Sequence, residues 1–296
     1  MQKENRNYKD TVFVDLFGKC AQAKENFLSL YNAIHNTHLR LSETEIKPVM
    51  LERTVYVGRY NDVSMLLNGR IIVLVEQQST INENMPLRFL EYVSRLYEKI
   101  IPQDDRYKQK LIPIPAPEFY VFYNGATDYP AEKTLRISDA FGSSCTKKSE
   151  LFPLELTVKV YNINKQDDTF LRQHCASLYG YKKLVQYAKE AKNAGTENHL
   201  DFAIARCIKE GILSDYLKQN STEVRNMLIA DYDYETDIRV KRQESFSDGF
   251  SQGIACGLAQ QKAEDEKLLF EERELRSKKE AEIAELKAQI AKLLQK

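Results

Sequence analysis

The chain has 296 residues, enough for one large domain with an appendage. Its 43 basic and 43 acidic side chains cancel, which excludes a generally basic coat for nucleic acid and leaves only a local patch for any polyanion. The longest apolar runs have the length of strands, which excludes a transmembrane span of roughly 20 apolar residues.

The cysteines are typical of a protein from a reducing compartment. They are scattered, odd in number and include no CxxC pair, so neither a zinc ribbon nor a disulfide framework is predicted. The N-terminal stretch MQKENRNYKD lacks the apolar core of a signal peptide. We therefore expect a cytoplasmic protein with no membrane segment. The cysteines are Cys20, Cys145, Cys175, Cys207 and Cys256.

In chain order, the pattern first predicts one or two helices over Asp10–Ser29, interrupted near Gly18. Three strands, a helix over Met85–Ile101 and two more strands follow, and the pattern then turns helical. A mixed α/β sheet flanked by helices is the natural packing for this order. The strands are predicted at 51–57, 62–67, 71–77, 118–125 and 154–163, and the late helices at 171–192, 200–219 and 222–232.

Past Val240 the composition changes. Gly249, Gly253 and Gly257 recur every four residues beside an apolar series of the same period, and from Gln261 the chain is mostly Glu, Lys, Ala and Leu. Two heptads at the end are fewer than a coiled-coil assignment needs. A solvated, frayed helix and an oligomerisation helix both fit, and we favour the second. The apolar series is Phe246, Phe250, Ile254 and Leu258, and the heptad positions are Ile283, Leu286, Ile290 and Leu293.

Two carboxylates lie near the ends of the hairpin that Asn68-Gly69 predicts, namely Asp62 and Glu76. Glu76 directly follows the apolar run Ile71–Val75, where an unpaired charge is costly. A two-residue turn would pair Asp62 with Val75. A three-residue turn or a bulge would pair it with Glu76 and place both carboxylates on one face.

Facing carboxylates repel each other unless a cation lies between them, and Mg²⁺ prefers such oxygen ligands. The three-residue register therefore predicts a metal site, with Gln78 on the same face as Glu76 because strand side chains alternate. The competing interpretation is structural. Glu76 would end its strand and turn to solvent, and Asp62 would cap a bend after Gly58.

The series NDVSMLL…VLVEQQSTINENMPLRFLEY resembles the recombination-promoting nuclease and putative-transposase family, a branch of the PD-(D/E)xK nuclease superfamily. The opening YKDTVFVDLFG, the stretch LTVKVYNIN, the following helices and the glycine-spaced tail are also similar, so the resemblance spans most of the chain. It implies a restriction-endonuclease-like sheet. We expect a nuclease-like core at 1–165, a helical extension at 166–240 and a helical tail, for which a coiled coil is one of the open alternatives, at 241–296.

By resemblance, Asp62 and Glu76 match the family's metal-binding acids, and Asp10 matches an acid that completes the metal shell. Gln78 falls where the wider superfamily has its lysine and where this family commonly has glutamine. Arg88, on the helix after the hairpin, matches an arginine that meets a phosphate or the site itself. Apart from the resemblance, the same helix carries Arg95 and Lys99, which with Arg88 are predicted to contact DNA along a phosphate track. The competing interpretation of such a basic run is a solvated helix face.

The sequence departs from the pattern at two positions. The superfamily's Pro-Asp is Asn61-Asp62 here, and Gln77 stands where close relatives often have histidine. Without the lysine, the developing negative charge has to be stabilised by Gln78, Arg88 or the metal.

The leading hypothesis is a DNA endonuclease dependent on Mg²⁺ or Mn²⁺, linked to recombination or mobile elements, that self-associates through its tail. The metal would activate water and clamp phosphate oxygens. Gln78 could orient that water but could not act as a base near neutral pH. The alternatives are a catalytically silent nuclease-fold protein that binds DNA or a protein, and an oligomeric scaffold built by the tail.

Overall fold

The computed structural model describes residues 11–49, 62–77, 82–141 and 154–294, and the strand predicted at 51–57 lies outside these ranges. In the described part of the chain, six strands form one mixed sheet in the order β1-β2-β3-β4-β6-β5. The pairs β1–β2, β2–β3 and β5–β6 are antiparallel, whereas β3–β4 and β4–β6 are parallel. The strands are β1 (Ile46–Pro48), β2 (Asp62–Leu67), β3 (Arg70–Gln77), β4 (Ala116–Tyr123), β5 (Glu132–Arg136) and β6 (Thr157–Asn162).

Helices precede, interrupt and follow the sheet. The N-terminal segment is α1 (Val12–Val14), a π-helical turn at Asp15–Lys19 and α2 (Ala23–His35), so the predicted interruption near Gly18 is confirmed. The helix predicted over 171–192 is instead two helices that meet at Cys175. The later helices are α3 (Met85–Ile100), α4 (Gln103–Arg106), α5 (Asp168–His174), α6 (Ala176–Asn193), α7 (His199–Lys209) and α8 (Ser214–Leu294); short 3-10 turns lie at Leu41–Glu43, Ile137–Ala140 and Ile163–Lys165.

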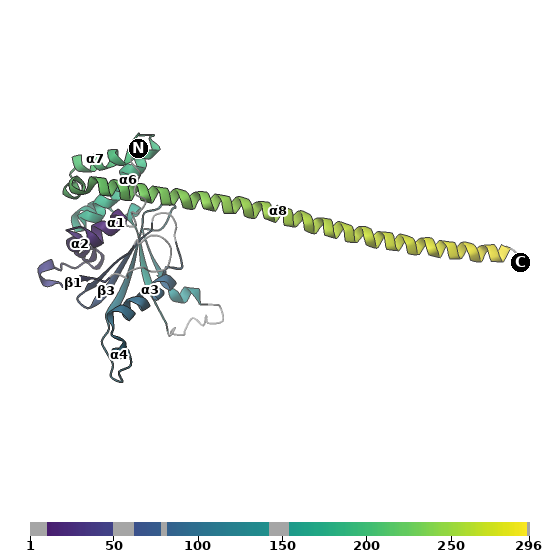
Figure 1. Cartoon of the computed structure of the whole chain (residues 1–296), viewed down its shortest axis with the longest axis horizontal. Helices are drawn as coiled ribbons and strands as arrows, with labels where there is room; N and C mark the ends of the chain where they lie inside the picture. Colours follow the sequence, from purple (N-terminus) through teal and green to yellow (C-terminus); the bar gives the residue numbers. More distant parts are fainter. Residues whose placement is uncertain (1–10, 50–61, 78–81, 142–153, 295–296) are drawn as a thin grey trace. The chain divides into compact units, whose positions relative to one another are not determined.

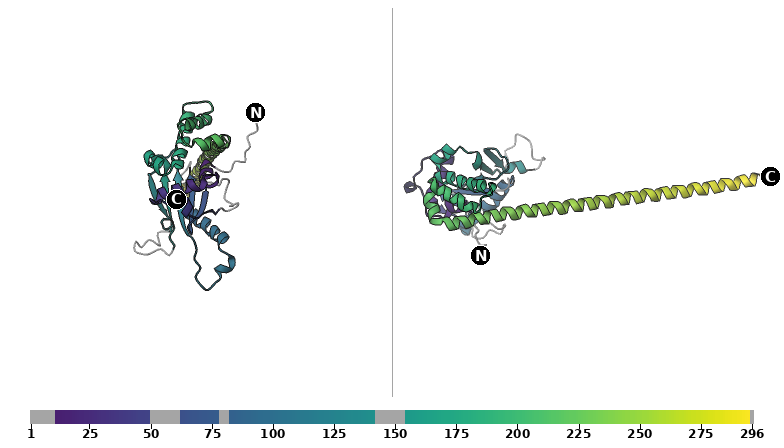
Figure 2. Two further views of the ribbon diagram at one scale, coloured as in Figure 1. Left: turned by 90° about the vertical axis from the view of Figure 1, so that its left-hand side faces the viewer. Right: turned by 90° about the horizontal axis from the view of Figure 1, so that it is seen from above.

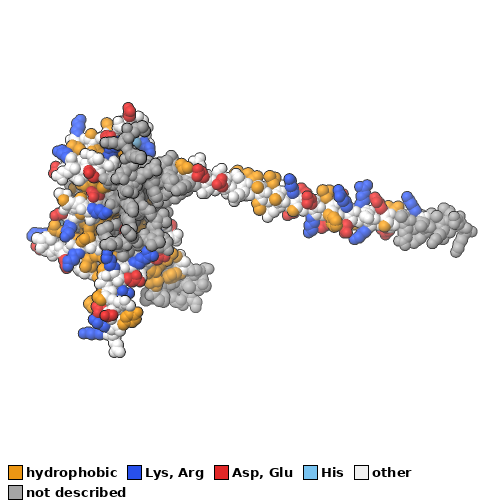
Figure 3. Space-filling view, in the orientation of Figure 1, with side chains coloured by type: hydrophobic (Ala, Val, Ile, Leu, Met, Phe, Trp, Pro, Cys, Tyr) orange, Lys and Arg blue, Asp and Glu red, His pale blue; other side chains and the backbone are white. Residues whose placement is uncertain are grey.

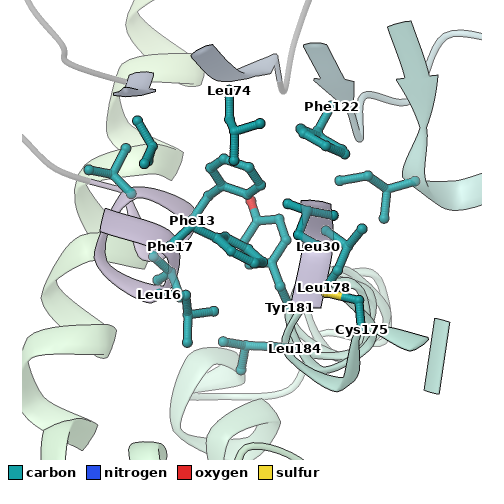
Figure 4. Close-up of a cluster of buried hydrophobic side chains, with 14 of the residues drawn as sticks. Phe13, Leu16, Phe17, Leu30, Leu74, Phe122, Cys175, Leu178, Tyr181 and Leu184 are labelled. Atoms are coloured by element: carbon teal, nitrogen blue, oxygen red, sulfur yellow. The ribbon is translucent and has the colours of Figure 1, made fainter. Parts of the chain in front are cut away.

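One face of the sheet is covered by the N-terminal segment and by helices that follow β6 (Figure 1). The Phe13 ring is tilted against that of Phe122 in β4 and forms a T-shaped pair with that of Tyr181 from α6, with ring centroids 5.5 and 5.8 Å apart (Figure 4). Leu74 of β3 belongs to the same buried cluster. The helices after β6 therefore share a hydrophobic core with the sheet.

The other face of the sheet is covered by α3 (Figure 2). Its apolar side chains Phe89, Val93 and Leu96 are buried at helical spacing against Val73 and Phe119 of the sheet. The helix begins with Pro86 in its first turn, where the missing N–H costs no hydrogen bond. This packing fixes which α3 side chains reach the polar end of β2.

The chain divides into two compact units, Met1–Asp233 and Tyr234–Lys296. The described part of the second unit is helical, and it exposes apolar and charged side chains (Figure 3). No helix in the described ranges contains a stretch long and apolar enough to cross a membrane. The predicted mixed α/β sheet flanked by helices, with a helical C-terminal region and tail, is confirmed.

Candidate active site

The β2–β3 hairpin turns on two residues. Asn68 and Gly69 have φ values of 45° and 77°, the left-handed backbone that an Asn-Gly hairpin turn requires. The strands pair Leu67 with Arg70 and Asp62 with Val75. The three-residue register was therefore wrong, because both turn residues accept positive φ and no third residue is needed.

This register removes the geometric argument for two directly opposed carboxylates. Asp62 is level with Val75, and the backbone of Glu76 is in register with Phe122 of β4. The side chain of Glu76 lies outside the described part of the structure, as do Asp10 and Gln78. The assembly of Asp62, Glu76, Asp10 and Gln78 into one site stays a prediction that depends on the family resemblance.

Asp62 begins β2 and lies half-buried on the face that α3 covers. Tyr92 of α3 makes a side-chain hydrogen bond with Asp62, and its hydroxyl lies 2.5 Å from the Ser64 hydroxyl. Ser64 is two residues after Asp62, on the same face of the strand, and only 1% exposed. The start of β2 thus carries a polar cluster within an apolar interface.

Burial raises the pKa of the Asp62 carboxyl above its ordinary value. The hydrogen bond from Tyr92 and the positive charge of Arg88 both act to lower this pKa but do not offset the burial. Burial is the main cause that raises the pKa of the Tyr92 phenol, and the negative charge of the nearby Asp62 raises it further. The Tyr92 phenol therefore keeps its proton and remains a hydrogen-bond donor to Asp62.

The predicted DNA-contacting residues share a stripe of α3 with Tyr92. Arg88, Tyr92, Arg95 and Lys99 follow one another at intervals of four, three and four residues, which is the spacing of one helix face. Arg88 is exposed, and its guanidinium also donates to the Met85 sulfur at 3.7 Å. A row of basic side chains thus runs along α3 from the neighbourhood of Asp62.

Among the residues that the structure describes, no three His, Cys, Asp or Glu side chains are grouped closely enough to hold a metal ion. Of the predicted ligands only Asp62 has a described side chain. Its half-buried carboxylate is a hard oxygen donor, the kind of ligand that Mg²⁺ and Mn²⁺ take. The chemistry of this single donor therefore fits the expected metal.

Tyr92 and Ser64 are the members of the cluster that sequence reasoning missed. In the sequence Tyr92 is one aromatic residue of an amphipathic helix, for which packing is the commoner role. Its position four residues after Arg88 was the available indication, because residues at that spacing lie on one helix face.

A second polar cluster lies where β3 and β4 begin. Glu118 accepts hydrogen bonds from Arg70 at 2.6 Å and from the Tyr120 hydroxyl at 2.7 Å, and the His35 ring nitrogen Nε2 lies 2.9 Å from its carboxylate. The His35 ring also stacks on Tyr31. This cluster links the end of α2 to the sheet. Because the Glu118 carboxylate already has partners within the fold, a structural role is the simplest interpretation.

Comparison with known families gives one match. Residues 62–205, just under half of the chain, match the family model described as putative transposase, YhgA-like. The chain matches no curated protein and no solved structure. The matched segment begins at Asp62 and ends within α7, so it includes the hairpin, α3 and the strands β4, β5 and β6, but not β1. The match confirms the family resemblance found in the sequence and is compatible with the PD-(D/E)xK assignment: from Asp62 into α7, the chain is similar to the YhgA-like putative transposases.

Proposed function

We propose that the protein is a metal-dependent DNA endonuclease associated with recombination or mobile elements. The family match supports a function related to mobile elements. The observation that carries the finer proposal is the placement of Asp62, a half-buried carboxylate oriented by Tyr92 and next to the positive charge of Arg88. Metal-assisted hydrolysis of a phosphodiester uses a carboxylate to hold the metal and a cation to meet the phosphate, and Asp62 and Arg88 are groups of these two kinds.

In this proposal Asp62, Glu76 and Asp10 would hold Mg²⁺ or Mn²⁺. When bound, a divalent cation supplies Lewis acidity and lowers the pKa of a bound water. Gln78 would orient the attacking water through a hydrogen bond. It could not act as the base, since an amide does not take up a proton near neutral pH. Arg88 meets the phosphate, and its bidentate guanidinium suits phosphate oxygens.

The DNA backbone would follow the basic row of α3. Arg95 and Lys99 lie on the same stripe as Arg88, at seven and eleven residues from it. Contacts of this kind position a duplex without reading its sequence. Arg88→Ala should therefore weaken DNA binding or turnover, and it should do so for every DNA sequence alike.

Plasmid cleavage in Mg²⁺ or Mn²⁺ tests the proposal. We expect the wild type to cleave, and Asp62→Ala and Glu76→Ala to abolish cleavage while the protein stays folded. Asp104→Ala, which removes an exposed carboxylate from α4, is the matched control and should cleave like the wild type. Equal nicking by the wild type and both site variants would point to a contaminant and would contradict the nuclease.

Gln78, in place of the superfamily's lysine, favours a second candidate, a catalytically silent protein that binds DNA or a protein partner. The two candidates differ in their response to Gln78→Lys, which restores the missing cation. A nuclease should tolerate this change or gain activity, whereas a silent binder should keep its DNA affinity and cleave nothing. Loss of activity with the fold intact would show that the glutamine has a specific role in orienting water.

We infer further that the tail self-associates, because the second unit exposes an apolar stripe. The side chains of Phe246, Phe250, Ile254 and Leu258 are 76, 63, 50 and 57% exposed. The tail from Lys241 to Lys296 contains 11 acidic and 11 basic residues, so two copies carry no net charge to repel each other. A second copy of the chain is thus the partner that this stripe fits, and paired active sites would suit cleavage of two strands.

The described cysteines support the cytoplasmic setting expected from the sequence. Cys20, Cys175, Cys207 and Cys256 are all free thiols. Burial raises the pKa of Cys175 and Cys207, which keeps these thiols protonated and unreactive.

A further inference from the structure

The hydrogen bonds around Asp62 have a defined direction. A carboxylate that ligates a metal is ionised and only accepts hydrogen bonds, so in that state the single proton of the Tyr92 hydroxyl is donated to Asp62. The Tyr92 oxygen is then the acceptor in its 2.5 Å contact with Ser64, and the Ser64 hydroxyl is the donor. The result is a chain of hydrogen bonds from Ser64 through Tyr92 to Asp62.

Two packed elements hold this chain in place. Asp62 and Ser64 come from one face of β2, and Tyr92 comes from α3. The neighbours of Tyr92 along the helix anchor α3 to the sheet, since Phe89 and Val93 are 2 and 5% exposed and the Phe89 ring lies 4.8 Å from that of Phe119. Ser64 is buried and cannot exchange its partner for bulk water. The Tyr92 hydroxyl therefore has little freedom of position.

We propose that Tyr92 is a positioning residue for Asp62, with Ser64 fixing the direction of the Tyr92 hydroxyl, so that the remaining lone pairs of the carboxylate point to a divalent cation. The proposal rests on the proposed metal-dependent function. A ligating carboxylate needs such an outer partner because the hydrogen bond fixes its rotamer before the metal arrives, and loss of a partner of this kind typically weakens metal affinity about 10- to 100-fold.

The alternative is that Tyr92 has a purely structural role and only holds α3 against the sheet. In that case loss of its hydroxyl would lower the stability of the protein and leave its metal affinity unchanged. Tyr97 provides the matched control, because it lies on the same helix and its hydroxyl donates to the Pro115 carbonyl at 2.6 Å. Tyr92→Phe and Tyr97→Phe each remove one hydroxyl from α3, but only the first removes a partner of Asp62.

The test is titration of the full-length protein with Mn²⁺, in which the free ion is followed by electron paramagnetic resonance, together with thermal unfolding of each variant without metal. We expect Tyr92→Phe to weaken Mn²⁺ affinity about 10- to 100-fold, Ser64→Ala to weaken it less, and Tyr97→Phe to leave it unchanged. Asp62→Ala should remove binding and so identify the site that the titration reports.

The outcomes separate this inference from the function on which it rests. If the wild type binds Mn²⁺ through Asp62 and Tyr92→Phe binds it equally well or more tightly, the positioning role is overturned and the metal site stands. If the wild type binds no Mn²⁺, the metal-dependent function fails, and the role of Tyr92 fails with it. Weaker binding by Tyr97→Phe to the same extent would show that any disturbance of α3 suffices, and it would also overturn the role of Tyr92.

Discussion

At the scale of single residues, Glu118 shows how a charge is retained in a largely buried place. Its side chain is only 15% exposed, and burial alone would raise its pKa. The hydrogen bonds from Tyr120 and Arg70, with the charges of His35 and Arg70, outweigh burial and hold the pKa of Glu118 below its ordinary value of 4.5. The folded state therefore favours the ionised form more than the unfolded state does.

A dependence of stability on pH follows from this depressed pKa. The stabilisation from ionised Glu118 is fully present above its unfolded value of 4.5 and is lost as pH falls through the folded value. We expect Glu118→Gln to cost about 1–3 kcal/mol at pH 7. Urea unfolding should show the gap between the wild type and Glu118→Gln shrinking as pH falls below 4.5.

Glu83→Gln is the control for Glu118. Its carboxylate is 57% exposed and pairs with Lys133, and such a surface pair contributes at most about 1 kcal/mol. The argument would be contradicted if both variants lost the same free energy of unfolding. It would also be contradicted if the difference between the wild type and Glu118→Gln did not change with pH, since the cluster would then stabilise by packing alone.

Gly180 is the second residue with a definite steric role. A Cβ atom added there would lie 2.4 Å from Cγ and 2.9 Å from Cδ1 of Leu213. Because Cγ is not the free end of the side chain, Leu213 cannot simply turn away. We expect Gly180→Ala to lower the free energy of unfolding by about 1–3 kcal/mol, as overpacking of a core does. Chemical denaturation of the full-length wild type and variant measures this loss in the free energy of unfolding.

A double-mutant cycle with Leu213→Ala tests the cause of that loss. If the clash is the cause, Gly180→Ala should cost little in a chain that already carries Leu213→Ala. Additive costs would show that Gly180 acts through something other than its contact with Leu213.

At the scale of elements, the hairpin turn fixes the register on which the site depends. Gly69 has a φ of 77°, and no atom lies within 4 Å of the place where its Cβ would be. A side chain at this position therefore meets only backbone strain. We expect Gly69→Ala to cost about 1–2 kcal/mol in urea unfolding. Gly69→Asn should cost less, because asparagine tolerates this backbone region, and the reverse order would contradict the argument.

The elements also show what the sequence could and could not predict. The Asn68-Gly69 pair located the hairpin, but it did not decide between turns of two and three residues. The three-residue turn predicted Glu76 as the partner of Asp62, whereas the partner in the structure is Val75. β5 was missed because Glu132–Arg136 has three charged residues and only Leu135 is buried, as is common at the edge of a sheet. The break at Cys175 was hidden because the apolar period continues from α5 into α6.

At the scale of the whole molecule, the candidate site combines parts that are distant in sequence. The acid at the start of β2 could be identified from its motif, and the basic row from its helical spacing. The role of Tyr92 could not, since it depends on how α3 packs on the sheet and brings its hydroxyl to Ser64, 28 residues earlier. Long-range packing of this kind leaves no local pattern in one sequence.

The last prediction concerns the tail. Gly249, Gly253 and Gly257 have no atom of the described residues within 4 Å of their missing Cβ positions, so no contact in that part of the chain explains glycine there. Each glycine costs a helix roughly 1 kcal/mol relative to alanine. Close approach of a second copy beside the exposed apolar stripe would offset this cost. Self-association should therefore depend on the stripe and not on the opposite helix face.

Light scattering at micromolar concentration should find the full chain as an oligomer. A chain ending at Val240 should be a monomer, and so should the full chain with Phe250→Lys and Ile254→Lys, because two lysines in the stripe would place like charges in the interface. Gln252→Lys puts one lysine on the other side of the same helix and should leave the oligomer intact. If the full chain and the shortened chain are both monomers, the tail does not mediate self-association, and cleavage of two strands by a built-in dimer is excluded with it.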